Sequence, residues 1–272
     1  MFESDLHAGT RGEVLERGLS EATSDLILVN PTRATMREFV DAYQAVPDPP
    51  SVSLFADEAP LKQLVEDFLI ASALADMVAA DAVTVRTLGT VPRHSLMVSE
   101  EFLVSLVESG GRICGLTTVE KSFVAGAYDE YQTRWADASS FSLRTPPLSH
   151  IRETLADDIG QDVADDFDTV LGMLETARGN GDGLDEVTVA LLAAANNSQL
   201  LYDISHWGED IRLASKATFS RSKNQLEDAG LIDTGKVPIE VGRPRLRLEL
   251  GDDELREAGI EKVARRTLQL MD

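Results

Sequence analysis

The stretch from residue 215 to residue 250 constrains the fold more than any other part of the chain. It begins with a polar-faced helical pattern, SKATFSRSKNQLEDA, and continues with Gly230-Leu231-Ile232. Two short extended segments follow, hinged on Val241-Gly242-Arg243-Pro244. Glycine directly after a helix is typical of a left-handed helix end, and the alternation of leucine and charge from Arg245 to Leu250 indicates a strand with one buried face. Helix, glycine and basic hairpin in this order predict the DNA-contacting half of a winged helix-turn-helix.

Two further helical patterns precede this segment. Apolar residues from Val187 to Leu192 predict a buried first helix that stops at Asn196-Asn197. Ser198 is expected to cap a second helix, which Gly208-Glu209-Asp210 breaks, and Ser215 is expected to cap the third. The three helices and the hairpin together would complete the winged module.

One face of the third helix has the composition of a DNA-reading surface. At 100° per residue, Phe219, Ser222 and Leu226 fall on the packing side, whereas the opposite side is small and polar, with Lys223 at its edge. Arginine pairs with guanine, asparagine with adenine, and alanine leaves room for a thymine methyl. We expect bases to be read by Ser220, Arg221 and Asn224, phosphates to be held by Lys216 and Arg245, and a narrow minor groove to be probed by Arg243. The full set of expected DNA contacts is Ser215, Lys216, Ala217, Thr218, Ser220, Arg221, Asn224, Arg243 and Arg245.

Charge separates this region from the rest of the chain. The 272 residues carry 25 Lys+Arg against 47 Asp+Glu, a formal net charge of −22. Residues 1–183 hold 13 basic and 31 acidic side chains, whereas residues 205–247 hold 8 and 6. An acidic excess spread along the chain is typical of proteins from the cytoplasm of salt-loving organisms. The alternative is an ordinary acidic protein. In molar potassium the Debye length falls to ~3 Å, so a basic excess of only two does not preclude DNA binding.

Several function classes lack their signatures. No run of about 18 apolar residues and no basic leader is present, and the single Cys114 fits a reducing compartment, so we expect a cytoplasmic, nucleoid-associated protein that does not contact membranes. The four histidines are far apart, and neither a P-loop nor GxGxxG occurs. We therefore expect no metal and no cofactor.

The first half of the chain alternates extended and helical patterns. Strands are predicted at residues 26–29, 51–55, 83–88, 95–98 and 112–116, and helices at 32–43, 60–79, 102–107 and 119–135. Interleaved elements of this kind predict an α/β fold with a largely parallel sheet covered by helices.

The chain divides into three predicted parts. Residues 1–148 form an α/β, sensor-like domain, residues 149–180 a helical connector, and residues 181–272 the winged helix with a last helix from Asp253 to Met271. The connector is either one long amphipathic helix or two helices broken at Gly160, and it packs on its own chain or on a second subunit. The glycines of residues 179–183 mark the expected boundary.

A small-ligand site is expected where strands of the first domain end. Gly115 to Thr118 ends a central strand and Asn30 ends the first, which is where ligands bind in parallel sheets. Candidate contacts are Asn30, Gly115, Thr117 and Thr118. The alternative is that these residues serve only the geometry of the turns.

The chain also resembles a known family. The segments LLYDISHWGED from Leu200, SKATFSRSKNQLEDAGLIDT from Ser215, KVPIEVGRPRLRL from Lys236 and LRTPPLS from Leu143 are similar to those of the haloarchaeal TbsP-type transcription regulators, named for a suppressor of the sugar regulator TrmB. The resemblance implies a sensor-like amino-terminal domain, a carboxy-terminal winged helix and action on genes of central sugar metabolism, with a sugar-related small molecule as the expected effector.

The first domain is also similar in element order to the phospholipase-D-like fold of TrmB sensors. That enzyme motif needs His, one residue, then Lys, but His94 is followed by Ser95 and Leu96, so an enzyme is not expected. Two hypotheses remain. The first is a sequence-specific regulator that binds double-stranded promoter DNA as a homodimer, because a pseudo-palindrome needs two copies. The second is a protein-interaction adaptor whose winged helix does not bind DNA.

Overall fold

The chain forms two units in the computed structural model, which describes residues 5–87, 89, 92, 94–109, 112–174, 177, 184–238, 244–257 and 259–271. The first unit comprises residues 1–65 and 73–143, and the second comprises residues 66–72 and 144–272. The second unit thus takes the start of one helix from the first half of the sequence. Among the described residues, no helix combines the length and apolarity needed to cross a membrane.

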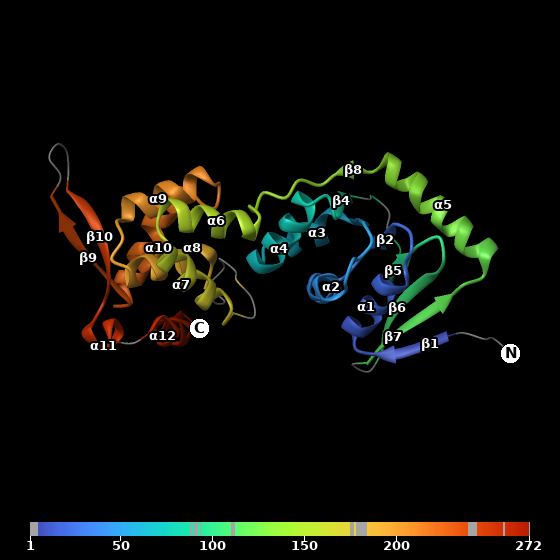
Figure 1. The fold of residues 1–272 in the computed structure, drawn as a ribbon, viewed down its shortest axis with the longest axis horizontal. Coiled ribbons are helices and arrows are strands. Elements are labelled where there is room, and N and C mark those ends of the chain that lie inside the picture. Colours follow the sequence, from blue (N-terminus) through green and yellow to red (C-terminus); the bar gives the residue numbers. More distant parts are fainter. Residues whose placement is uncertain are drawn as a thin grey trace. The chain divides into compact units, whose positions relative to one another are not determined.

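A mixed sheet of eight strands is the centre of the first unit (Figure 1). Its spatial order is β1-β7-β6-β5-β2-β3-β4-β8. The strands are β1 Asp5–Gly9, β2 Leu26–Val29, β3 Val52–Ala56, β4 Val83–Thr87, β5 Ser95–Val98, β6 Leu103–Ser109, β7 Arg112–Thr118 and β8 Ser139–Ser140. Only β2, β3 and β4 pair in parallel, and every other neighbouring pair is antiparallel.

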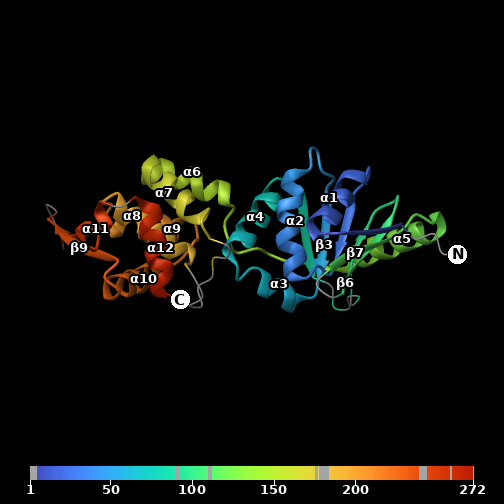
Figure 2. The same cartoon turned by 90° about the horizontal axis from the view of Figure 1, so that it is seen from below.

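Helices cover both faces of this sheet (Figures 1 and 2). They are α1 Arg11–Glu21, α2 Arg33–Ala45, α3 Glu58–Leu64, α4 Phe68–Ala79 and α5 Lys121–Asp137. Ile27 and Val29 of β2 pack with Phe55 and Tyr131 on the α5 side. The ring of Phe55 stacks on that of Trp135 with centroids 5.2 Å apart. Because strand side chains alternate, the neighbouring residues Leu26 and Leu28 are buried on the opposite face.

The α/β class is confirmed, with three local corrections. The expectation of a largely parallel sheet is correct for β2, β3 and β4 and wrong for the region from β5 to β7, which runs as an antiparallel meander. Residues 102–107, predicted as helix, belong to strand β6, because a short apolar run does not distinguish the two periods. The predicted helix 60–79 is two helices, α3 and α4, separated at residues 65–67.

The second unit consists of helices followed by a two-stranded hairpin (Figure 1). Its elements are α6 Leu148–Asp158, α7 Gln161–Leu171, α8 Glu186–Asn196, α9 Leu201–Asp210, α10 Lys216–Asp228, β9 Ile232–Val237, β10 Arg245–Leu250, α11 Asp253–Arg256 and α12 Ile260–Met271. Gly160 has φ +143°, so the alternative of two helices broken at this glycine is confirmed. The predicted last helix is likewise divided into α11 and α12.

One apolar core joins α6 and α7 to the helices that follow. Residues 187–195 of α8 are all buried, and Phe167 of α7 packs in the same cluster. Asp166 accepts hydrogen bonds from the side-chain amides of Asn196 and Asn197 at 2.7 and 2.6 Å. The indole of Trp207 donates to Thr154 Oγ1 at 3.0 Å. The predicted connector is therefore packed on the winged module of its own chain. The glycine-rich boundary at residues 179–183 lies outside the described residues.

Two predicted helix signals in this unit are wrong. Ser198 has φ +52° and lies in the turn, and α9 begins after Leu200 without a side-chain cap. The segment Gly208-Glu209-Asp210 does not break α9 but completes it. Glycine stands at position 208 because a Cβ there would overlap the ring of Phe219 on α10. The glycine thus reflects a close helix crossing rather than a helix end.

Candidate nucleic-acid interface

Helix α10 presents the face that its sequence predicts. Ser215 caps the helix by accepting a hydrogen bond from the backbone N–H of Thr218. Phe219, Ser222 and Leu226 are buried. On the opposite side, Ala217, Ser220, Arg221 and Asn224 are exposed. Ser215 and Lys216, which were predicted at the start of the helix, are exposed as well, and Thr218 is half-buried. A small, polar, solvent-facing surface on a helix anchored by a phenylalanine has the form that can enter a major groove.

Lys223 differs from its expected place at the edge of the helix. It is 8% exposed, and its Nζ lies 2.6 Å from Glu227 Oε2. Glu227 also accepts a hydrogen bond from Thr234 Oγ1 of β9 at 2.7 Å. The side-chain hydrogen bonds from Lys223 and Thr234 lower the pKa of Glu227 against the opposing effect of burial. This chain of contacts joins the predicted recognition helix to the hairpin.

The hairpin is fixed to the helices at its base. Gly230, with φ +69°, ends α10 in the left-handed conformation that the sequence predicts. β9 and β10 pair antiparallel from Ile232↔Leu250 to Val237↔Arg245. The backbone N–H of Leu248 donates to the carbonyl of Gln199 at 2.8 Å, in the turn before α9. The predicted tip, including Arg243, lies outside the described residues.

The two cations predicted to hold phosphates both have carboxylate partners on α9. Lys216 Nζ lies 2.9 Å from Glu209 Oε2, and Arg245 Nη1 lies 3.2 Å from Asp203 Oδ1. The guanidinium of Arg245 also lies 4.1 Å above the ring of Tyr202, which is 46% exposed. Hydrogen bonding raises the pKa of Lys216 and lowers the pKa of Glu209, so both groups are charged at neutral pH.

The sequence did not predict that residues of α9 lie beside α10 and β10 in the candidate interface. Tyr202 and His206 are four residues apart, and their rings meet edge to face with centroids 5.7 Å apart. That spacing on one helix face was the available signal. The pairing of Asp203 with Arg245, 42 residues away, had no signal in the sequence.

In the first unit, Asn30 is engaged within the fold. Its φ is +48°, and its side-chain amide donates to the carbonyl of Pro92 at 2.7 Å. The carbonyl of Asn30 accepts from Ser95 Oγ at 2.8 Å. Asn30 therefore joins the end of β2 to the start of β5. Gly115 is buried, and a Cβ there would lie 2.9 Å from Val14 of α1.

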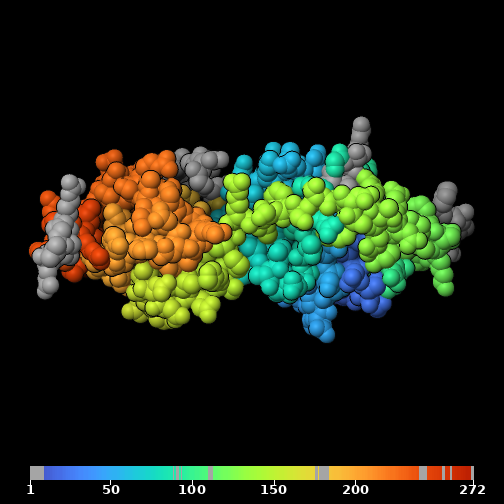
Figure 3. Space-filling view, turned by 90° about the horizontal axis from the view of Figure 1, so that it is seen from above, coloured from blue at the N-terminus to red at the C-terminus, as the bar shows by residue number. Residues whose placement is uncertain are grey.

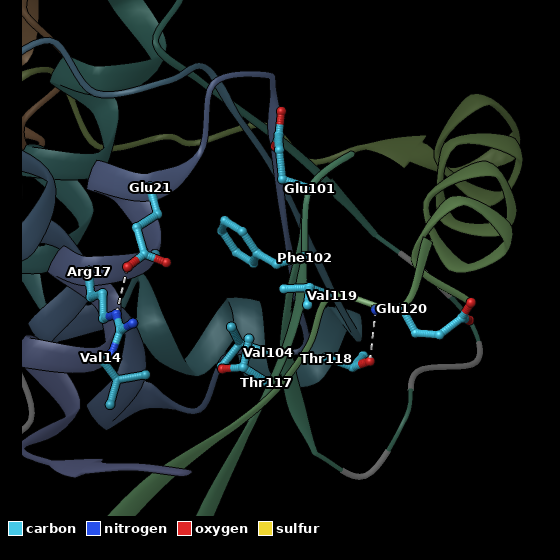
Figure 4. Close-up of a pocket in the computed structure, with 11 residues that line it drawn as sticks. Val14, Arg17, Glu21, Glu101, Phe102, Val104, Thr117, Thr118, Val119 and Glu120 are labelled. Carbon is cyan, nitrogen blue, oxygen red and sulfur yellow. Dashed lines mark hydrogen bonds and ion pairs between the residues drawn. The ribbon is translucent and has the colours of Figure 1, made fainter. Parts of the chain in front are cut away.

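Thr117 and Thr118 line a hollow of about 630 Å³ beside α1 (Figure 4). Its apolar lining includes Val14, Phe102 and Val104. Charged groups also line it: the Arg17–Glu21 pair at 2.7 Å, Glu101 and Glu120. Burial alone would raise the pKa of Glu101, but hydrogen bonds from Thr23, Ser99 and Ser24 together outweigh it and lower the pKa. Backbone N–H groups of α5 lower the pKa of Glu120. The hollow thus has an apolar lining and carboxylates that outnumber its cation.

Two family models together match nearly the whole chain. The amino-terminal domain of TbsP-like transcriptional regulators matches residues 3–146, and the carboxy-terminal helix-turn-helix domain of the same regulators matches residues 147–268. The chain belongs to the TbsP-like transcriptional regulators. The family is one of transcriptional regulators, and its carboxy-terminal domain is a helix-turn-helix domain.

Solved structures align with about half of the chain. Three of them are the archaeal chromatin protein TrmBL2 (13% identity, TM-score 0.36, 51% of this chain and 54% of that chain), the phospholipase D family member Nuc from Salmonella typhimurium (11%, 0.36, 51% and 99%) and NucT from Helicobacter pylori (13%, 0.35, 52% and 100%). The chain therefore spans about half the length of TrmBL2. No curated protein matches the sequence.

Proposed function

We propose that this TbsP-like regulator reads promoter DNA with α10 in the major groove and the wing in the minor groove. The observation that supports this proposal is the exposed face of α10, where Ser220, Arg221 and Asn224 stand opposite the buried Phe219. Arginine and asparagine form bidentate pairs with guanine and adenine. Arg243, at the predicted wing tip, is proposed to contact the minor groove.

Arg221→Ala tests base reading. The substitution removes one bidentate donor from an exposed position, so we expect a loss of about 1–3 kcal/mol in binding to the cognate promoter, with the fold unchanged. Gel shifts in high KCl, with the promoter and a scrambled duplex, measure the effect. Arg265→Ala is the matched control, since it removes an exposed arginine that lies on α12 rather than on α10 or the hairpin. Wild-type affinity in Arg221→Ala would sink the proposal.

The proposed targets are genes of central sugar metabolism. The regulator is proposed to act as a nucleoid-associated homodimer in a salt-rich cytoplasm. Two copies suit a pseudo-palindromic operator because each winged helix reads one half-site. Chromatin profiling with and without glucose tests the targets, and sedimentation in high KCl tests the dimer. Occupancy that avoids metabolic promoters would contradict the assignment.

The hollow beside α1 is the proposed effector site. Its carboxylates would repel a sugar phosphate, whereas hydroxyl groups of a neutral sugar can donate to carboxylates and Thr117 while a sugar face packs on Phe102. Thermal shifts with glucose and with glucose 6-phosphate distinguish the two ligands. The alternative function, a protein-interaction adaptor, is favoured by the carboxylate partners of Lys216 and Arg245, and it would replace the DNA proposal if no duplex binds.

A further inference from the structure

A second hollow, of about 500 Å³, lies between α9, α10 and the start of β10. Lys216 and Ser220 of α10, Arg245 of β10 and Tyr202 of α9 all line it. The α9 region is at the molecular surface, as the orange atoms of the space-filling view show (Figure 3). Two cations from separate elements therefore border one surface hollow.

Carboxylates of α9 hold both cations at this hollow. The side chains of the Lys216–Glu209 pair are 43% and 46% exposed, and those of the Arg245–Asp203 pair are 37% and 41% exposed. Ion pairs as exposed as these are weak, because water screens them and ordering the side chains costs entropy. An anion brought to the hollow by a partner can therefore displace the carboxylates at small cost.

The ring of Tyr202 gives Arg245 a second anchor. Because the guanidinium lies 4.1 Å from the ring centroid, the cation–π contact can keep it at the hollow when Asp203 is displaced. The edge contact with His206 positions the ring in turn. Arg245 is therefore placed to exchange one anion for another without leaving the surface.

We propose that this hollow is a binding site for a backbone phosphate of DNA, which takes Lys216 and Arg245 from Glu209 and Asp203. The inference rests on the proposed DNA binding and names two residues, Asp203 and Glu209, that oppose it. On binding, each displaced carboxylate attracts a solvent cation, which offsets a counterion that the phosphate releases. The acids of α9 thus lower the affinity for DNA and make its dependence on salt shallower.

Asp203→Asn and Glu209→Gln test the site in the full-length protein. Each variant frees one cation, so we expect about two- to fivefold tighter binding to promoter DNA at 0.2 M KCl, as removal of an exposed pair implies. The plot of log affinity against log KCl becomes steeper in each variant, by at most about 0.9 for the one phosphate of the site. Glu261→Gln is the matched control: it makes the same charge change in an exposed pair with Arg265 on α12 and leaves the slope unchanged. Circular dichroism verifies the fold of each variant.

The outcomes separate the inference from the function on which it rests. Wild-type protein that binds promoter DNA, together with unchanged or weaker binding by both variants, overturns the phosphate site and leaves the regulator proposal intact. If the salt dependence of Glu261→Gln steepens equally, the phosphate site is also overturned, because the effect would then come from the total charge of the protein. Absence of wild-type binding to any duplex removes the regulator proposal and this site together.

Discussion

Two carboxylates beside the hollow of each unit are held in different ways. In the hollow of the first unit, Glu101 accepts from the hydroxyls of Thr23 and Ser24, and Glu120 accepts from backbone N–H groups and Ser122. Beside the hollow of the second unit, by contrast, Asp203 and Glu209 form ion pairs with Arg245 and Lys216. Neutral donors leave the first hollow negative, whereas ion pairs keep cations near the second. A strongly acidic chain can therefore maintain two surface hollows of different charge.

The units also differ in what surrounds their closely packed glycines. A Cβ at Gly115 of β7 would lie 2.9 Å from Val14, whereas a Cβ at Gly208 of α9 would overlap the aromatic ring of Phe219 more deeply. The buried ring is part of α10, so the geometry of α10 depends more on one glycine than the sheet does.

Gly208→Ala is expected to have the largest effect. Overpacking against Phe219 destabilises the second unit by about 1–3 kcal/mol and shifts α10, whereas Gly115→Ala costs less because its Cβ overlaps Val14 less deeply. Denaturant unfolding of the two variants measures the difference. Gly126→Ala on α5, where a Cβ meets nothing within 4 Å, is the control and should be neutral or stabilising. Equal costs at positions 208 and 115 would contradict the contrast.

A second prediction concerns pH. Burial raises the pKa of Glu186, at the start of α8, to about 7. A folded-state pKa above the unfolded value means that the protonated form stabilises the fold below pH ~4.5, and that this stability is lost as pH rises through 7. Glu186→Gln keeps the neutral form, so its melting temperature should exceed that of the wild type by a few degrees at pH 8 and match it at pH 4.5.

Glu101 of the first unit supplies the opposite case. Its lowered pKa favours the ionised form in the fold, which contributes stability above pH ~4.5 that is lost as pH falls through the folded pKa. Glu101→Gln should therefore lower the melting temperature at pH 8. Thermal melts of both variants at the two pH values test the contrast, and shifts of the same sign would break it.

Thr234→Val is expected to have the smallest effect. It removes the hydrogen bond from Thr234 to Glu227 while the Lys223–Glu227 pair remains, so stability should fall by about 1 kcal/mol. Looser coupling of β9 to α10 should also speed amide exchange in the hairpin. Thr133→Val on α5, whose hydroxyl donates to the helix backbone at Asp129, is the control. Unchanged exchange would mean that the base of the hairpin is fixed by the backbone alone.

Local patterns predicted the features whose signal lies within one element. Phe219, Ser222 and Leu226 of α10, the Ser215 cap and Gly230 are set by helical periodicity and backbone preference, which act over a few residues. Where the signal was ambiguous, as in the apolar run of β6, the prediction was wrong because pairing with β5 and β7 decides the period there.

By itself, the sequence determined the α/β and winged-helix elements, the acidic balance and the exposed face of α10. Only the tertiary structure decided that Gly208 serves a helix crossing, that β5 to β7 run antiparallel, and that Asp203 and Glu209 hold Arg245 and Lys216. The physical reason is distance along the chain: these contacts join residues on different elements, so they depend on how the core brings those elements together rather than on any local preference.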